Sequence, residues 1–430
     1  YAGAAGRVEK ITTHASRIFL AGERAYKLKR AVKYSYLDYS TADLRRRACE
    51  AELALNRRTA PELYLAVLPI LRRPDGTLAF EGEGEAVDWV VAMRRFPQEA
   101  LFSHLAETGR LTLPLAMQAA DRIAAFHAAA EPMRGQGGVA GIRAVIAIND
   151  ENLRRSPPGG LQTADIDRLR DATLAALARH ATLLDRRRDA GKVKRCHGDL
   201  HLANICLLDG VPTLFDCIEF SDLIACIDVL YDLAFLLMDM RHRGLAAEAA
   251  QVFNRYLDRS EESDGLPALP LFLSLRAAVR AHVTATAAKA DAATRQQQLT
   301  AARAYFDMAE ELLRPLPPRL VAIGGLSGTG KSSIAAALAG DLGVAPGARV
   351  LRSDVLRKRL FGQAPESRLP ADAYAPEVNA RVYVALENAA RDALAAGYCV
   401  IIDAVAARPE ERQAFAALAA AAGVAFTGLW

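Results

Sequence analysis

The period of the hydrophobic positions changes along the chain. In the first hundred residues, apolar and polar positions alternate in short runs, and residues 41–56 carry apolar side chains on one helical face with charges opposite. Side chains alternate between the two faces of a strand and recur every three or four positions on a helix. This part therefore predicts one helix among strands at 16–20, 24–28, 64–71 and 88–93.

Helical spacing dominates from residue 100 onward. The segment Arg314-Pro-Leu-Pro-Pro-Arg319 ends this region, since proline breaks a helix and stiffens a linker. Beyond it, strand and helix patterns alternate, as a parallel α/β sheet requires. The helices predicted before the prolines lie at 115–130, 165–184, 227–240, 245–257, 270–290 and 294–313.

Composition narrows the class of protein. A chain of 430 residues with 52% hydrophobic residues predicts two or three globular domains. A formal charge of +4 gives little reason to expect a nucleic-acid partner, and no apolar run reaches the length of a membrane span. The six cysteines form no Cys-x-x-Cys pair, so we expect neither a zinc ribbon nor a redox motif but a cytoplasmic protein.

Residues 325–332 read Gly-Leu-Ser-Gly-Thr-Gly-Lys-Ser, between an apolar strand at 320–323 and a helix-forming stretch at 333–339. Glycines in such a loop let backbone N–H groups surround a polyphosphate, and the helix N-terminus adds partial positive charge. Lys331 would reach the β- and γ-phosphates, and Ser332 would hold Mg²⁺. The pattern predicts an ATP site made by Gly325, Ser327, Gly328, Thr329, Gly330, Lys331, Ser332 and Ser333.

A second phosphoryl-transfer pattern lies upstream. His197-Gly-Asp-Leu-His-Leu-Ala-Asn204 precedes Leu214-Phe-Asp-Cys-Ile-Glu219, the Asp–Asn–Asp layout of protein kinases. In that layout Asp199 accepts the proton of the attacking hydroxyl, while Asn204 and Asp216 hold Mg²⁺. Two alternatives remain at this point: Asp199 and Asn204 as a turn and its cap, or His197 and His201 as metal ligands.

The His-Gly-Asp-x-x-x-x-Asn loop resembles that of the aminoglycoside phosphotransferase family, over roughly residues 10–310. With the phosphate loop following, the order of domains resembles the bifunctional aminoglycoside phosphotransferase/ATP-binding proteins. The resemblance implies an α/β and α+β multidomain chain, in which a bilobal protein-kinase-like fold precedes a parallel-sheet P-loop NTPase domain. We expect a small lobe at 1–95, a helical large lobe at 96–313, a linker at 314–318 and the P-loop domain at 319–430.

A kinase-like small lobe needs a strand lysine that pairs with the ATP phosphates and with a helix glutamate. Lys27 and Lys29 lie on one face of their strand, and we favour Lys27 because it follows an apolar pair; the alternative is a solvated lysine. Glu50 and Glu52 both lie on the following helix. We name Glu52 as the partner of the strand lysine, and Glu50 remains the alternative. Residues 12–16 stand where protein kinases carry a Gly-rich loop, and they contain no glycine.

In the C-terminal part, Asp354 and Arg357 resemble the Asp-x-x-Arg pair of small P-loop kinases. The resemblance implies that Asp354 orients or deprotonates an acceptor hydroxyl and that Arg357 holds substrate or phosphate; the alternative for Asp354 is a helix cap. Asp403 ends an apolar strand, the Walker B arrangement that reaches Mg²⁺ through water. Later strands and an arginine-bearing lid are missing from this sequence. We therefore expect a C-terminally incomplete domain with slow turnover.

Other charged residues have simpler interpretations. By resemblance, Asp228 holds the backbone of the catalytic loop, residues 197–204; alternatively it is a carboxylate at a helix start, as Asp232 is. The arginine runs at 45–47 and 186–188 predict solvated helix faces.

Together these patterns predict an ATP- and Mg²⁺-dependent phosphotransferase acting on a hydroxyl of a small molecule, since no Ala-Pro-Glu follows Asp216 at the distance typical of protein kinases. One alternative is a nucleotide-binding regulatory or sensor protein with one silent domain. Another is a P-loop domain that only hydrolyses ATP. The oligomeric state stays open.

Overall fold

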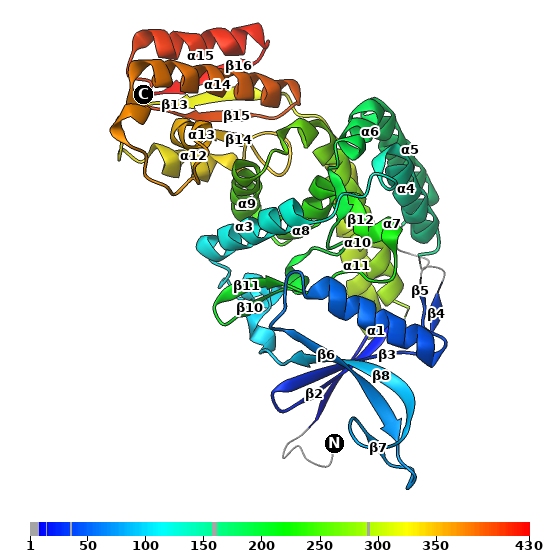
Figure 1. Ribbon diagram of the computed structural model, residues 1–430. Coiled ribbons are helices and arrows are strands. Elements are labelled where there is room, and N and C mark those ends of the chain that lie inside the picture. The colour runs from blue at the N-terminus through cyan, green and yellow to red at the C-terminus, as the bar shows by residue number, and fades with distance from the viewer. Residues whose placement is uncertain (1–7, 14, 35–36, 157–160, 290–292) are drawn as a thin grey trace.

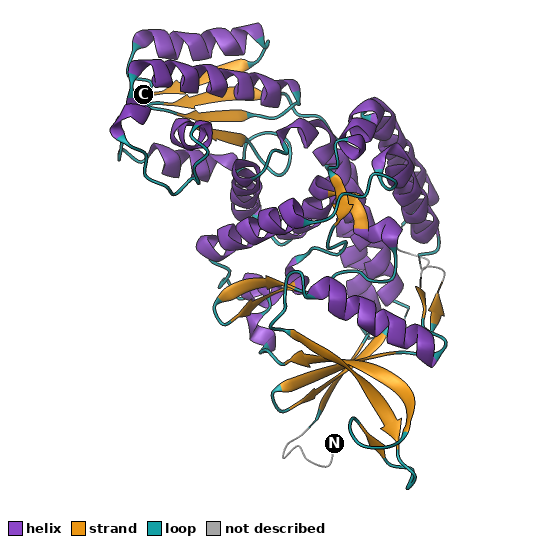
Figure 2. Cartoon of the chain, in the orientation of Figure 1, coloured by secondary structure: helices purple, strands orange, loops and turns teal. Residues whose placement is uncertain are grey.

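The computed structural model describes residues 8–13, 15–34, 37–156, 161–289 and 293–430. A strand-rich lobe lies at one end, a helical region follows, and a second sheet flanked by helices lies at the other end (Figure 1). Figure 2 shows the strands gathered mainly in the two outer parts. This arrangement confirms the expected fold class, a bilobal kinase-like fold followed by a parallel-sheet domain.

The N-terminal lobe is an antiparallel six-stranded sheet in the order β1-β2-β3-β8-β6-β7. The helix α1 (Ala42–Asn56) packs on it, and Thr41 caps that helix by accepting from the Leu44 backbone N–H at 3.3 Å. The strands are β1 (Glu9–Thr12), β2 (Ser16–Ala21), β3 (Arg24–Lys29), β6 (Tyr64–Arg72), β7 (Leu78–Ala79) and β8 (Glu85–Arg94), with a separate pair β4 (Lys33–Tyr34) and β5 (Leu37–Asp38).

The middle of the chain is mainly helical, and α8 is buried along almost its whole length. A single helix was expected at 165–184, but the chain forms two, separated at His180. The helices are α2 (Phe102–Glu107), α3 (Leu113–Ala129), α4 (Gly138–Arg154), α5 (Thr163–Arg179), α6 (Ala181–Asp189), α7 (Asp222–Ala225), α8 (Val229–His242), α9 (Ala246–Arg259), α10 (Leu269–Ala287) and α11 (Arg295–Glu311).

Short elements frame the catalytic loop within this helical region. The hairpin of β10 (Ile205–Leu208) and β11 (Val211–Leu214) separates the two halves of the Asp–Asn–Asp pattern, and β9 pairs with β12 on either side of it. The other short elements are β9 (Val193–Arg195), β12 (Cys226–Asp228), η1 (Gln98–Ala100), η2 (Leu202–Asn204) and η3 (Ser263–Ala268).

The C-terminal sheet is entirely parallel, in the order β14-β15-β13-β16. Carboxyl ends of parallel strands meet at one edge, where ligands bind in open α/β sheets. That edge here carries the loop after β13 and Asp403 at the end of β15. The elements are β13 (Arg319–Ile323), α12 (Lys331–Ala339), β14 (Arg349–Arg352), α13 (Ser353–Leu360), η4 (Ala371–Tyr374), α14 (Pro376–Ala395), β15 (Val400–Asp403), α15 (Pro409–Ala421) and β16 (Ala425–Leu429).

The helix α9 holds the edge strand of this sheet. The side-chain amide of Asn254 donates to the Ala348 carbonyl at 3.0 Å, and its oxygen accepts from the Val350 backbone N–H at 2.7 Å. Arg349 extends the contact to the Asp258 carboxylate at 2.7 Å. An unpaired strand edge exposes backbone groups that pair readily with other chains. Asn254 satisfies two of these groups within the molecule.

The prediction that both arginine runs are solvated is wrong for their buried members. Arg45 is buried and donates to Asp88 at 2.8 Å. Arg187 is fully buried and binds three carboxylates, those of Asp228, Glu262 and Asp264, at 2.6–2.9 Å. Helical spacing alone could not reveal these partners, because they come from β12, the loop before η3 and η3 itself.

Among the described residues, no helix combines the length and the apolar character that a membrane crossing requires.

Replacing Arg187 tests the weight of this buried cluster. We expect Arg187→Leu to lower the free energy of unfolding by about 3–5 kcal/mol, because it leaves buried carboxylates without their counter-charge. Urea denaturation followed by circular dichroism measures the change. Arg186→Leu is the matched control, since Arg186 is exposed on the same helix. Equal losses of unfolding free energy in the two variants would contradict a stabilising role for the buried Arg187 cluster.

Candidate active site

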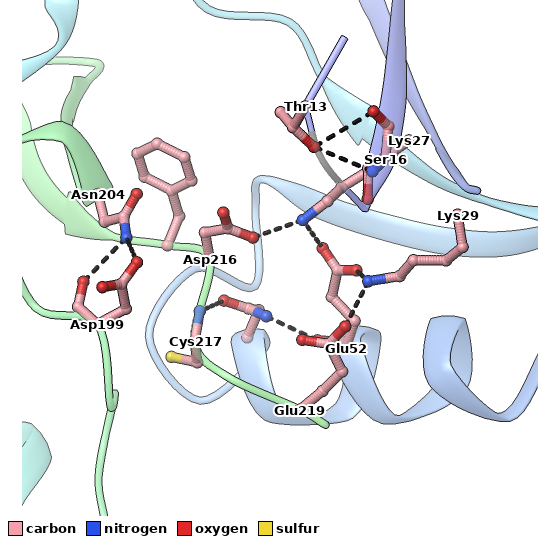
Figure 3. A network of polar contacts seen from close by, with 12 residues as sticks. Thr13, Ser16, Lys27, Lys29, Glu52, Asp199, Asn204, Asp216, Cys217 and Glu219 are labelled. Carbon is pink, nitrogen blue, oxygen red and sulfur yellow. Dashed lines mark hydrogen bonds and ion pairs between the residues drawn. The ribbon is translucent and has the colours of Figure 1, made fainter. Parts of the chain in front are cut away.

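The strand lysine and the helix glutamate meet beside Asp216. Lys27 on β3 places its Nζ 2.8 Å from Glu52 Oε1 on α1 and 2.5 Å from Asp216 Oδ1 (Figure 3). Glu52 is fully buried, while the Asp216 side chain keeps 42% of its surface exposed. Lys27 thus links the small lobe to the segment after the β10–β11 hairpin.

Lys29 joins the same cluster from the next inward position of β3. Its Nζ lies 2.5 Å from Glu52 Oε2 and also binds Glu219, whose carboxylate accepts a 2.6 Å hydrogen bond from the Tyr39 hydroxyl. Glu50 instead forms an exposed pair with Arg46 at 3.0 Å. Both lysines therefore share Glu52, and Glu50 lies outside the cluster.

Opposing effects set the charge of these groups. Burial alone lowers the pKa of Lys27, but the carboxylates of Asp216 and Glu52 outweigh it and hold that pKa well above its ordinary value. Burial raises the pKa of Glu52, yet Lys27 and Lys29 bring it below the ordinary range. The lysines are therefore cations and Glu52 is an anion at neutral pH.

Asp199 and Asn204 face each other across the catalytic loop. The Asn204 amide donates to both the Asp199 carbonyl and its Oδ2, each at 2.9 Å. Gly198 has φ of +84°, and a Cβ there would lie 3.1 Å from the Ile224 carbonyl oxygen. Only glycine suits that backbone and that space, which explains the His-Gly-Asp order. A turn and its cap account for part of this geometry, because Asn204 does close the loop.

The Asp199 carboxylate is ionised. Burial raises its pKa, but His201, 3.4 Å away, together with His197 and Arg276 holds that pKa well below its ordinary value. Both ring nitrogens of His197 have protein partners, the Phe215 carbonyl at 2.8 Å and the Asp199 backbone N–H at 3.4 Å. This histidine therefore braces the loop, and the metal-ligand alternative does not fit it.

Asp232 anchors the catalytic loop. Its buried carboxylate accepts from the backbone N–H groups of His197 at 3.0 Å and Gly198 at 2.9 Å. The expectation that Asp228 does this is wrong: Asp228 caps α8 by accepting from Leu230 N–H and binds Arg187. Its alternative, a carboxylate at a helix start, describes it correctly.

Two further residues support this loop, and the sequence did not single them out. Arg276 on α10 donates to the Gly198 carbonyl at 3.1 Å, and its guanidinium lies over the Tyr231 ring. His127 at the end of α3 lies 3.1 Å from Asp232 through Nε2. Both are buried and distant in sequence, so only helical periodicity on a buried face marked them.

Asp216 itself is held in an uncommon backbone conformation. Its φ is +67°, rare for a residue other than glycine, and its backbone N–H donates to the Tyr64 hydroxyl at 3.1 Å. The next residue, Cys217, donates its N–H to Asn56 on α1 at 2.8 Å. These contacts aim the Asp216 carboxylate towards Lys27.

The segment at 12–16 that replaces a Gly-rich loop includes residue 14, which lies outside the described residues. The strand β8 pairs with β3 so that Val91 lies opposite Lys27.

The phosphate loop follows β13 as the sequence predicts. Gly325, Gly328 and Gly330 all have positive φ, and α12 begins at Lys331 directly after Gly330. The Lys331 ammonium donates to the Leu326 carbonyl at 2.7 Å, so it closes the loop on itself. The remaining predicted members, Ser327, Thr329 and Ser333, are exposed on the loop and the first turn of α12.

Ser332 and Asp403 meet at the carboxyl edge of the sheet. The Ser332 hydroxyl donates to Asp403 Oδ2 at 2.5 Å, and the Arg352 Nε lies 3.8 Å from the same oxygen. A hydroxyl and a carboxylate are the oxygen ligands that Mg²⁺ prefers. Asn204 and Asp216 offer a similar oxygen set in the other site, so both sets fit a magnesium ion.

Asp354 and Arg357 are engaged within the C-terminal domain. Asp354 lies in the first turn of α13, where it pairs with Lys358 at 2.7 Å; the N-cap position belongs to Arg352. The cap alternative for Asp354 is therefore wrong. Arg357 is buried, donates to the Ala373 carbonyl at 2.8 Å and lies over the Tyr374 ring.

Comparison with known proteins finds two families. The model of the phosphotransferase enzyme family matches residues 24–272, more than half of the chain, and an AAA domain model matches residues 320–430. Uncharacterized proteins of Mycobacterium tuberculosis and Mycobacterium bovis are 30% identical over 419 residues, which is 95% of this chain and 80% of theirs.

Solved structures of two kinds are similar. A choline/ethanolamine kinase family protein from Mesorhizobium loti matches with a TM-score of 0.43 and 16% identity, over 73% of this chain and 94% of its own. An aminoglycoside phosphotransferase from Streptomyces rimosus matches with a TM-score of 0.36 and 19% identity, over 64% and 93%. The family matches support kinase-type phosphoryl transfer that uses ATP. This chain belongs to the phosphotransferase enzyme family.

Proposed function

We propose that the chain transfers the γ-phosphoryl group of ATP to a hydroxyl group of a small molecule at the site between its lobes. One observation carries the proposal: Lys27 bridges Glu52 and Asp216 while Asn204 binds Asp199 nearby. These groups come from β3, α1, the catalytic loop and the segment after β11. Phosphoryl transfer from ATP uses a lysine–glutamate pair and an Asp–Asn–Asp set of this kind together.

Each residue has a distinct task in this proposal. Lys27, held by Glu52, binds the phosphates of ATP, and the ionised Asp199 accepts the proton of the attacking hydroxyl. Asn204 and Asp216 would hold Mg²⁺, which supplies positive charge that neutralises the phosphoryl group. Phosphoryl transfer depends mainly on positioning and electrostatics, and the buried anchors of the loop support both.

The P-loop domain is proposed as a second kinase-like unit. In it Lys331 and the loop backbone bind ATP, Ser332 and Asp403 hold Mg²⁺, and Asp354 orients an acceptor. The lobes then span 1–95 and 96–313, the linker 314–318 and the second unit 319–430. Arg357 is buried, donates to a backbone carbonyl and lies over the Tyr374 ring, which favours a supporting role over phosphate contact. Six buried, unpaired cysteines support a cytoplasmic location.

The acceptor is proposed to carry few positive charges. A polycationic acceptor needs free carboxylates, but four described carboxylates that follow the catalytic loop in sequence are engaged. Glu219 binds Lys29 and Tyr39, and Asp222 binds Arg195 at 2.5 Å. Asp228 binds Arg187, and Asp232 binds backbone N–H groups of the loop. Internal pairing leaves these four little net attraction for an outside cation.

Replacing Asp199 tests the proposed proton acceptor. We expect Asp199→Asn to slow transfer of labelled γ-phosphate into a pool of small hydroxyl compounds by about 10²–10⁴-fold. The reason is that an amide accepts no proton while leaving the shape of the loop unchanged. The protein with Asp199→Asn and the protein with Asp199 both also carry Lys331→Ala, so that the P-loop site does not contribute to the labelled product.

The matched control is Asp209→Asn, since Asp209 is an exposed carboxylate on the β10–β11 turn that binds Arg94. We expect full transfer in this variant. Full transfer in Asp199→Asn would overturn the proposed role. Nucleotide binding without any labelled product would favour a sensor.

Replacing Ser332 tests the second site. We expect Ser332→Ala to weaken binding of ATP by about tenfold or more when Mg²⁺ is present, because the metal loses one ligand. Fluorescence of Trp430, whose ring lies against Gly324, reports binding. The same titration with EDTA is the control, and there the variant and the unmodified chain should agree. A loss that is equal with and without Mg²⁺ would contradict the metal role.

A further inference from the structure

The helix α9 belongs to the kinase-like part but holds the strand that leads to Asp354. Asn254 binds β14 through Ala348 and Val350, and Asp258 binds Arg349. The Phe253 ring stacks on Tyr398 with centroids 5.8 Å apart. The first turn of α13, with Asp354, follows β14 directly. A shift of α9 therefore displaces β14 and, with it, Asp354, the residue proposed to orient the acceptor of the P-loop domain.

The same helix reaches the segment between α13 and η4. Glu366 in this segment lies 2.5 Å from Arg255 and 2.8 Å from Arg259, and both arginines also bind Asp121 on α3. The Arg359 side chain donates to the Ser260 carbonyl at the end of α9 at 2.8 Å. These contacts fix α9, α3 and the P-loop domain to one another.

Another residue of α9 connects to the catalytic loop. The Tyr256 hydroxyl lies 2.9 Å from His127 Nδ1, and His127 Nε2 lies 3.1 Å from Asp232. Asp232 in turn holds the backbone N–H groups of His197 and Gly198, directly before Asp199. Three side chains therefore join α9 to the proposed proton acceptor.

Burial makes this connection stiff. Tyr256 and Asp232 are fully buried, and His127 and Asn254 are nearly so. A buried polar group that loses its partner costs about 1–3 kcal/mol, so α9 cannot move alone without leaving such groups unpaired. Packed elements of this kind switch between discrete arrangements and do not deform gradually.

We propose that α9 couples the two nucleotide sites, with Tyr256 as the positioning residue that links it to the catalytic loop. The inference rests on the proposed function, since it requires that both sites bind ATP. Nucleotide at one site then changes affinity at the other, and linkage requires the same factor in both directions.

The chain's two tryptophans allow each site to be followed separately in the 430-residue chain. Trp89 lies on β8, two residues before Val91, which pairs with Lys27, and Trp430 lies against Gly324 before the phosphate loop. Trp430→Phe leaves the first reporter, and Trp89→Phe leaves the second. Mg·ATP is titrated against each protein with the other site intact or disabled for ATP binding. Lys331→Ala disables the P-loop site, and Lys27→Ala disables the site between the lobes.

We expect the affinity of each site for Mg·ATP to change by about fivefold or more when the other site is disabled, by the same factor in both directions. Tyr256→Phe removes one hydroxyl from the connection and should bring both factors close to one. Tyr305→Phe is the matched control: it is a buried tyrosine of α11, stacked on His242 and outside the connection, and it should leave the factors unchanged.

Binding at both sites with factors of one would overturn the coupling alone, and so would factors that Tyr256→Phe leaves unchanged. Absence of ATP binding at either site, checked by equilibrium dialysis with labelled ATP, would overturn the proposed function of that site and the coupling with it. A change in Tyr305→Phe equal to that in Tyr256→Phe would also overturn the role of α9.

Discussion

The kinase-like site depends on the hydrogen bonds that the buried Asp232 carboxylate accepts from the backbone of the catalytic loop. Burial by itself raises its pKa, but the hydrogen bond with His127 and the nearby His197 and Arg276 bring it below the ordinary value. The carboxylate therefore stays charged and binds two backbone N–H groups of the catalytic loop. A buried charge is tolerated only when it is fully paired, so the loop and the helices around Asp232 hold one another in place.

This contact explains how a loop with little regular structure is held in one conformation. The loop between β9 and β10 has little regular structure of its own, and Gly198 allows a backbone that no other residue would adopt there. Asp232 and Arg276 fix that loop from α8 and α10. On the other side, Lys27 and Glu52 fix Asp216 from the small lobe. The site lies where these two rigid supports meet.

Local patterns in the sequence predicted the parts of the fold that depend on neighbouring residues. The phosphate loop, the Asp–Asn–Asp pattern and most strands and helices carry their chemistry within a few positions, and the family matches confirm the two-part architecture. The sequence also indicated that one of two glutamates pairs with the strand lysines, but only the packing of α1 on β3 selects Glu52.

Contacts between distant segments could not be predicted in this way. Arg187 looks like a member of a solvated run until its three carboxylate partners fold around it. Asp228 and Asp232 are equivalent by spacing, and only the fold decides which one reaches the catalytic loop. The link through Tyr256, His127 and Asp232 joins three helices, and a single sequence shows no sign of it.

The most direct test of the central claim is to identify the phosphorus product by ³¹P nuclear magnetic resonance. The full chain is incubated with Mg·ATP and a pool of small hydroxyl compounds, and a second sample contains no acceptor. A phosphotransferase that acts on hydroxyl groups should give a phosphate-ester signal and ADP only when acceptors are present. ADP and inorganic phosphate without a phosphate ester in both samples would contradict the account.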